Sequence, residues 1–212
     1  MRSISVISAL ALLSALSSLP AQANQTKLQE IQSNWAICQY NTPEKSEQKQ
    51  CFQTLIQHTE KVLAHEPPTP ALTVWLAINK ASLAGVKGGL GALSLAKEAK
   101  ALLEQVIETA PETLDGSAYT SLGSLYYKVP GWPIGFGDDG KAEQLLKQAL
   151  AINPNGIDPN YFYGDFLLEE GRNQEAKMYF TKALNAAPRA ERPLADQGRR
   201  QEINLKMAKL TD

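Results

Sequence analysis

Apolar residues recur at helical spacing along much of the chain. In the segment 142–154, Ala142, Leu146 and Ala149 lie four and three residues apart, which places them on one face of a helix. Pro154 follows, and proline cannot continue a helix because it lacks the backbone N–H. The same spacing near the C-terminus places Ile203, Met207 and Leu210 on one helical face. The pattern therefore predicts an all-α chain.

The helical pattern of residues 142–154 is repeated 34 residues later in the chain. The four matching positions of the later copy are Ala176, Phe180, Ala183 and Pro188. Upstream, Leu122, Gly123 and Tyr126 match Tyr163, Gly164 and Leu167, but here the displacement is 41 residues. Seven residues have thus been added inside the earlier copy. A glycine on one helix and an alanine on the next allow two antiparallel helices to approach closely, with larger apolar residues filling the layer between neighbouring pairs.

This period and these residues resemble the tetratricopeptide repeat (TPR) family, whose units are helix-turn-helix pairs. The resemblance implies an all-α, right-handed superhelix of such repeats with a C-terminal capping helix. Ser117 and Asp158 are expected to cap the first helices of two units, with Pro159 at the first helical position. The expected segments are a signal peptide (1–23), a divergent hairpin (24–68), a degenerate TPR-like hairpin (69–115), a TPR with an insertion (116–156), a regular TPR (157–190) and the capping helix (191–212).

The resemblance also implies a pairing for the two cysteines of the chain. Placing Trp35 at the aromatic position of a TPR first helix puts Cys51 at the small position of the second helix and Cys38 beside the closest approach of the two. A disulfide requires Cα atoms about 4.4–6.8 Å apart. We therefore expect a Cys38–Cys51 disulfide, and the alternative is two buried free thiols.

The N-terminus is typical of a secretory signal. Arg2 is followed by an apolar stretch with scattered serines, and small residues precede Asn24. We expect cleavage after Ala23 and export to the periplasm, with no membrane insertion of the mature chain. With 21 basic and 22 acidic residues, the net charge of −1 offers no general attraction for nucleic acid or anionic lipid.

The insertion at residues 129–140 holds prolines, glycines, Trp132 and Phe136, and it contains the spacing of a phosphate-binding loop. Such a loop follows a strand and carries Ser or Thr after its lysine, whereas a helix is expected here and Ala142 follows Lys141. Asp138 and Asp139 would also repel phosphate. We expect no nucleotide binding. Instead, an aspartate caps the next helix, and the aromatic residues either fold back onto the helices or contact a partner.

Candidate catalytic and metal-binding residues are few. His58 and His65 lie seven residues apart, whereas histidines that share a zinc ion on a helix are usually four apart. No Ser, Cys or carboxylate accompanies a histidine in a catalytic pattern. The sequence predicts a solvated helix face, no metal, no cofactor and no enzymatic activity.

The resemblance places the first helix of each unit on the concave face, where family members hold a peptide or a partner helix. Tyrosine and small hydroxyl side chains there suit an uncharged or mildly cationic peptide. A protein or peptide partner is therefore expected. The alternative is a periplasmic component associated with a solute transporter, in which the helical array holds a small ligand. This alternative rests on the loop, which is similar to glycine-rich insertions of that group. The candidate binding residues are Thr120, Ser124, Tyr127, Lys128, Tyr161, Asp165 and Glu169, together with Trp132 and Phe136 of the loop.

Overall fold

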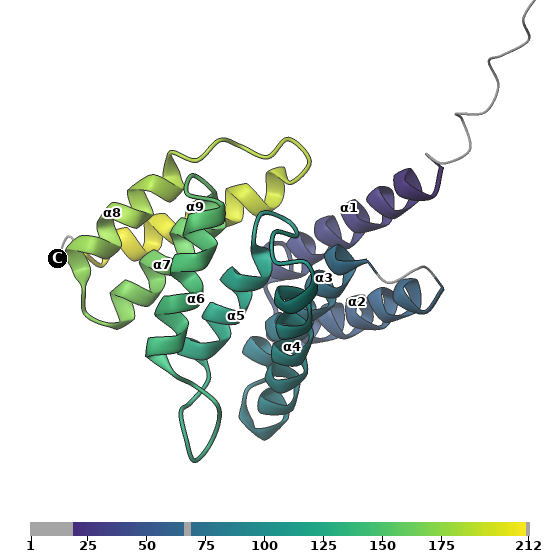
Figure 1. Cartoon of the computed structure of the whole chain (residues 1–212), viewed down its shortest axis with the longest axis horizontal. Coiled ribbons are helices and arrows are strands. Elements are labelled where there is room, and N and C mark those ends of the chain that lie inside the picture. The colour runs from purple at the N-terminus through teal and green to yellow at the C-terminus, as the bar shows by residue number, and fades with distance from the viewer. Residues whose placement is uncertain (1–18, 66–68, 211–212) are drawn as a thin grey trace, which may run out of the picture.

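The computed structural model describes residues 19–65 and 69–210, and within them the chain forms nine α-helices (Figure 1). Consecutive helices pair as antiparallel hairpins, α1 with α2, α3 with α4, α5 with α6 and α7 with α8, and α9 follows alone. The all-α helical repeat fold is thus confirmed. The helices are α1 (Leu19–Tyr40), α2 (Lys45–His65), α3 (Pro70–Lys87), α4 (Gly89–Thr109), α5 (Ser117–Lys128), α6 (Asp139–Ile152), α7 (Ile157–Glu169), α8 (Asn173–Leu184) and α9 (Pro193–Ala208).

Small residues allow the helices of the two regular hairpins to approach closely. A Cβ atom added to Gly123 of α5 would lie 2.8 Å from Cγ of Leu146 on α6. A Cβ atom added to Gly164 of α7 would lie 2.9 Å from the ring of Phe180 on α8. Real Cβ atoms do not approach other carbon atoms so closely, so a larger residue at either position would push the helices apart. The glycine of the repeat is therefore a packing requirement.

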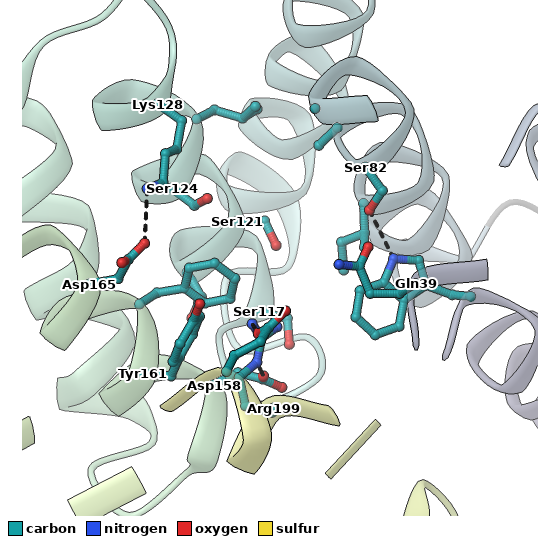
Figure 2. Close-up of a pocket in the computed structure, with 18 of the residues that line it drawn as sticks. Gln39, Ser82, Ser117, Ser121, Ser124, Lys128, Asp158, Tyr161, Asp165 and Arg199 are labelled. Carbon is teal, nitrogen blue, oxygen red and sulfur yellow. Dashed lines mark hydrogen bonds and ion pairs between the residues drawn. The ribbon is translucent and has the colours of Figure 1, made fainter. Parts of the chain in front are cut away.

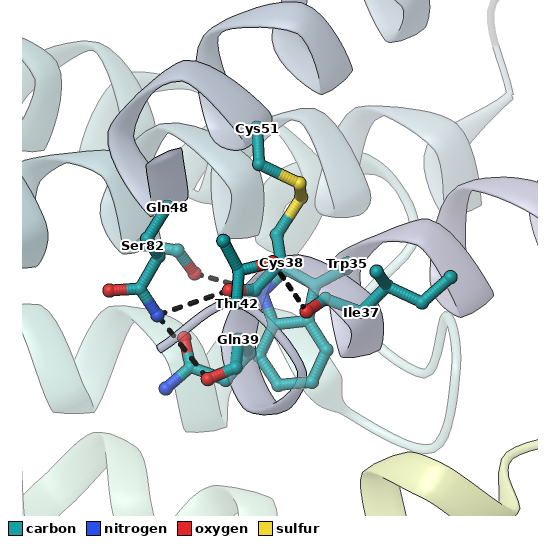
Figure 3. Close-up of a disulfide and its surroundings, with 8 residues drawn as sticks. All are labelled: Trp35, Ile37, Cys38, Gln39, Thr42, Gln48, Cys51 and Ser82. Carbon is teal, nitrogen blue, oxygen red and sulfur yellow. Dashed lines mark hydrogen bonds between the residues drawn. A yellow bond between two sulfur atoms is a disulfide. The ribbon is translucent and has the colours of Figure 1, made fainter. Parts of the chain in front are cut away.

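The N-terminal hairpin has a separate core centred on Trp35, and it is closed by a disulfide (Figure 3). The ring of Trp35 packs edge to face against Trp75 of α3, and its Nε1–H donates a 2.9 Å hydrogen bond to Ser82. Cys38 of α1 and Cys51 of α2 are joined, with their Cα atoms 5.5 Å apart. The expected disulfide pairing is thus confirmed.

The last helix does more than cover the end of the array. α9 packs against α8 and α7, and it also reaches back to α1 (Figure 1). The contact with α1 is close, because a Cβ atom at Gly198 would lie 2.4 Å from the ring of Tyr40. The two ends of the array therefore meet.

Two expected helix caps are wrong, and one is confirmed. Ser117 is the first residue of α5 and its hydroxyl donates to the carbonyl of Leu114, so it does not cap the helix. Asp158 lies inside the first turn of α7, where two arginines hold its carboxylate, so Pro159 is not the first helical residue. Asp138 does cap α6, because its Oδ1 accepts a 2.9 Å hydrogen bond from the N–H of Lys141.

The predicted signal segment, residues 1–23, falls mostly outside the residues that the structure describes. α1 begins at Leu19, so its first residues overlap the predicted segment. Among the described helices, none combines the length and the apolar character that a membrane-spanning helix requires.

Candidate functional site

A cavity of about 1370 Å³ lies on the concave side, where α3 and α4 face α5, α7 and α9 across an open space (Figure 2). The walls of the cavity differ in the chemistry of their side chains, because each wall is formed by different helices. The α5 wall is polar, the α3 and α4 walls are largely apolar, and α7 and α9 supply charge. The cavity is therefore amphipathic.

The α5 wall carries a row of hydroxyl groups. Ser117, Ser121 and Ser124 lie four and three residues apart, so they face the cavity on successive turns (Figure 2). Thr120 also lines this wall and is 5% exposed. Hydroxyl groups both donate and accept hydrogen bonds, so this row can pair with the amide groups of an extended chain.

The opposite wall is mainly apolar. Trp75, Ile78 and Val86 of α3 reach the cavity, and Ala92 and Ala96 of α4 continue the surface. Alanine and glycine here leave room that larger side chains would fill. This wall therefore offers an apolar body a place to pack, opposite the hydroxyl row.

Beside Tyr161, α7 and α9 are joined by ion pairs. Asp158 Oδ2 lies 2.7 Å from the guanidinium of Arg189, and Asp158 Oδ1 lies 3.0 Å from that of Arg199. Burial alone would raise the pKa of Asp158, but the positive charges of Arg199 and Arg189 outweigh this and hold the pKa well below its usual range. The guanidinium of Arg199 stacks 4.1 Å from the Tyr161 ring centroid. These contacts hold α9 in place beside the cavity.

A second charged group surrounds Asp165 of α7. Its carboxylate is 3% exposed and lies 3.0 Å from Nζ of Lys128 and 2.5 Å from Nζ of Lys206. Tyr127 donates a 3.0 Å hydrogen bond to the same carboxylate. Burial opposes the charge of Asp165, but Lys128 and Lys206 outweigh it and lower the pKa. The group therefore links α5, α7 and α9 across the cavity wall.

Five of the candidate groove residues line the cavity, namely Thr120, Ser124, Lys128, Tyr161 and Asp165. Two do not. Tyr127 is turned into the protein, where burial and the nearby Asp165 raise its pKa, and Glu169 lies outside the cavity, paired with Lys128. Sequence reasoning missed the contributions of α3 and α9, because only the first helices of the regular repeats were considered. The basic residues that α9 and its preceding loop bring into the cavity are Arg189, Arg192, Arg199 and Lys206.

The loop at residues 129–140 divides into a packed part and an exposed part. Phe136 packs edge to face against Tyr126, with ring centroids 5.5 Å apart. Trp132 and Ile134 are 90% and 67% exposed, so of the two alternatives for the loop, folding back onto the helices holds for Phe136 and not for Trp132. The loop backbone is closely packed at Gly137, where an added Cβ would lie 2.0 Å from the carbonyl oxygen of Val129. Val129, Pro130 and Ile134 line the cavity, so the loop stands at its rim.

The two histidines lie apart from the cavity. His58 Nε2 is 3.5 Å from Glu30 on the outer side of the first hairpin, and His65 is exposed near the end of α2. In the part of the chain that the structure describes, no three His, Cys, Asp or Glu side chains gather as metal ligands.

Comparisons with known proteins agree with this architecture. Residues 135–197 match the model of a tetratricopeptide repeat family. Among solved structures, the chain is similar to TTC0263, a thermophilic TPR protein of Thermus thermophilus, with 18% identity and a TM-score of 0.55 over 89% of this chain and 96% of that one. A structure of MamA is also similar, with 20% identity and a TM-score of 0.44 over 79% of this chain and 91% of that one. A comparison with curated proteins found no match.

Residues 135–197 therefore carry a tetratricopeptide repeat, and the similarity to TTC0263 shows the same fold over most of the chain. The matched segment begins within the loop and ends in α9, so it covers the regular repeat formed by α7 and α8. The TPR fold is typical of scaffolds that bind other proteins rather than of enzymes. The fold and the cavity together therefore indicate a binding protein.

Proposed function

We propose that the protein is an exported scaffold that holds a short segment of a partner protein inside its cavity, with the loop at residues 129–140 as a second contact. The observation that carries this proposal is the amphipathic cavity of about 1370 Å³ on the concave side. Pockets for small molecules are typically about 300–1,000 Å³, so this one is large enough for a stretch of polypeptide. The hydroxyl row on α5 offers hydrogen bonds to the backbone of the partner segment, and the apolar residues of α3 pack against the side chains of that segment.

Export is part of the proposal, and the disulfide supports it. Disulfides persist in oxidising compartments such as the periplasm and are rare in the cytosol. The Cys38–Cys51 disulfide joins α1 to α2 in the first hairpin after the predicted signal. The segment 1–23 is therefore proposed to direct the chain to the periplasm.

A small ligand is the second candidate, because the contact between α1 and α9 borders the cavity on one side. A concave site lined by apolar residues shields part of a small molecule from water. An association with a solute transporter stays a prediction from the loop sequence.

The proposal is tested by blocking the cavity. Ser121 lies at the centre of the hydroxyl row, so Ser121→Trp fills the space, whereas Gln174→Trp adds the same side chain on the exposed surface of α8. A synthetic octapeptide library is passed over the immobilised protein and the retained peptides are measured by mass spectrometry. We expect retention by the wild type and by Gln174→Trp, and loss in Ser121→Trp. No retention by the wild type, or equal retention by all three, would contradict the proposal.

A further inference from the structure

Arg192 differs from the other arginines around the cavity. Its neighbours Arg189 and Arg199 each form an ion pair with Asp158. Among the described residues, no carboxylate or carbonyl group forms an ion pair or hydrogen bond with the guanidinium of Arg192, and its Nε is buried without a partner. Arg192 therefore places a positive charge on the cavity wall that the protein itself does not neutralise.

Trp75 lies directly beside this charge and is also incompletely satisfied. The guanidinium carbon of Arg192 is 4.9 Å from the centroid of the Trp75 ring, which is the geometry of a cation–π contact. Trp75 is 3% exposed, and its Nε1–H has no hydrogen-bond acceptor. A buried donor without an acceptor is destabilising, because it has lost its hydrogen bonds to water. Both N–H groups are buried away from the open cavity, so they mark an incompletely satisfied pair, which a ligand contacts through the exposed part of Arg192 on the cavity wall.

The electrostatic environment of Arg192 agrees with its geometry. Burial lowers the pKa of Arg192, and the nearby Asp158 compensates only in part, because Arg189 and Arg199 repel the added charge. For Arg189, burial also opposes the charge, but Asp158 and Asp196 outweigh it and raise the pKa. The carboxylates of this cluster are thus held by the other two arginines. A bound anion would supply the partner that Arg192 lacks.

We propose that Arg192 and Trp75 form an anchor for a carboxylate at the end of the cavity ligand, whose apolar body packs along the α3 wall beside Trp75 and Ile78. This inference rests on the proposed function and names the chemistry of the ligand end that the cavity selects. A carboxylate matches the planar fork of a guanidinium and can accept two hydrogen bonds from it. The wall beyond Trp75 is apolar, which favours an apolar group next to the carboxylate.

The site differs from the positions that were expected to hold a ligand. The expected residues were on the first helices of the regular repeats, whereas Arg192 precedes α9 and Trp75 lies on α3. The two meet only because α9 turns back toward α1. The anchor therefore depends on the closure of the array.

A terminal carboxylate is present both in a peptide and in a small organic acid, so both are used as probes. The first pair is the octapeptide library with free carboxyl ends and the same library with amidated ends. The second pair is octanoate and octanamide, with binding followed by tryptophan fluorescence in a Trp132→Phe background, which removes the exposed tryptophan of the loop. Preference for the free peptides identifies a peptide end, and preference for octanoate alone identifies a small acid.

The matched variants are Arg192→Gln and Arg172→Gln. Arg172 lies outside the cavity, at the start of α8, and pairs with Glu143 and Glu175. We expect Arg192→Gln to weaken binding of the free-acid probe about tenfold or more, because a hydrogen-bonded charge pair is lost, while Arg172→Gln binds as the wild type does. Arg192→Lys keeps the charge without the fork and should retain part of the affinity.

Three outcomes are distinguishable. Loss of the free-acid preference in Arg192→Gln alone, with an unchanged melting temperature, supports the anchor. Equal binding of acid and amide forms by the wild type overturns the anchor but leaves the proposed function standing. No binding of any probe by a folded wild type contradicts the proposed function, and the anchor falls with it.

Discussion

The first four helices and the following four are held together by different means. α1 to α4 are 18 to 22 residues long, and their packing relies on a disulfide and on the contact between Trp35 and Trp75. α5 to α8 are 12 to 14 residues long and pack through a glycine on one helix that fits against a large side chain on the next. The hairpins α5–α6 and α7–α8 thus pack without a covalent link, whereas the divergent hairpin α1–α2 has a disulfide. The cavity lies between the two parts and requires both.

The largest effect is expected from removing the disulfide by Cys38→Ala with Cys51→Ala. The disulfide closes a loop with a sequence separation of 13, and loops of this size contribute about 3 kcal/mol by restricting the unfolded chain. The measurement is urea unfolding followed by circular dichroism, combined with hydrogen exchange. Faster exchange should be confined to α1, α2 and α9. Equal loss of protection in α7 and α8 would show that the two parts do not differ as described.

Asp158→Asn tests the charge contacts that fix α9. The substitution removes the carboxylate from Arg189 and Arg199, and arginines that lose a partly buried partner become costly to keep. We expect a loss of about 2 kcal/mol in the free energy of unfolding, below the ~3–5 kcal/mol of fully buried pairs. Glu175→Gln, which removes an exposed carboxylate from Arg172, is the control and should have almost no effect. Similar losses in both would contradict a special role for Asp158.

The same carboxylate makes stability depend on pH. The folded-state pKa of Asp158 is lowered, so its contribution is fully present above its unfolded value near 3.9 and is lost as the pH falls below that value. The wild type should therefore lose more stability than Asp158→Asn as the pH is lowered from 5 to 3. Melting curves over this range give the measurement. Parallel losses in both proteins would assign the acid sensitivity to other groups, such as Glu143, whose pKa is lowered to about 2 by hydrogen bonds from Arg172 and Lys147.

A pair of glycine substitutions compares the two parts directly. Gly164→Ala places a Cβ 2.9 Å from the Phe180 ring, and we expect a loss of about 1–3 kcal/mol from overpacking. Gly85 lies in α3 with nothing within 4 Å of an added Cβ, so Gly85→Ala should stabilise by about 0.4–1 kcal/mol. Thermal unfolding measures both. Destabilisation by Gly85→Ala would show that α3 packs more tightly than described.

The smallest effect on stability is expected at the loop. Trp132 is 90% exposed, so Trp132→Ala should change the free energy of unfolding by less than about 0.5 kcal/mol. Phe136→Ala is the matched variant, and because Phe136 packs on Tyr126 it should destabilise measurably. If the loop also contacts the partner, Trp132→Ala will reduce peptide retention without changing the melting temperature. An unstable Trp132→Ala would assign the side chain a packing role.

The regular repeats were predictable from the sequence because the contacts that define them are local. Gly164 and Ala176 lie close in sequence within one hairpin, so their spacing recurs in the sequence with the period of the repeat. The candidate residues Ser124 and Tyr161 were found for the same reason, since their place on the first helix fixes their direction. The disulfide was predictable once Trp35 was aligned with the repeat.

The remaining part of the site depends on contacts between distant segments. Arg192 meets Trp75 only because α9 reaches α1, and no periodic signal records that contact. Asp158 was expected to be a cap because aspartate is common at helix starts, but its arginine partners come from residues 189 and 199. Trp132 is exposed in the folded loop, which composition alone does not reveal.

The most direct test of the central claim is site-specific photo-crosslinking in cells, with the probe placed at Ser121 inside the cavity or at Gln174 on the outer surface of α8. The proposed function predicts a discrete adduct from Ser121 and none from Gln174, with tandem mass spectrometry locating the crosslink in one short segment of a single partner. The adduct should disappear when Arg192→Gln is added if the segment ends in a carboxylate. A folded protein that yields no adduct from Ser121, or the same adducts from both positions, would contradict the claim that the cavity holds a partner segment.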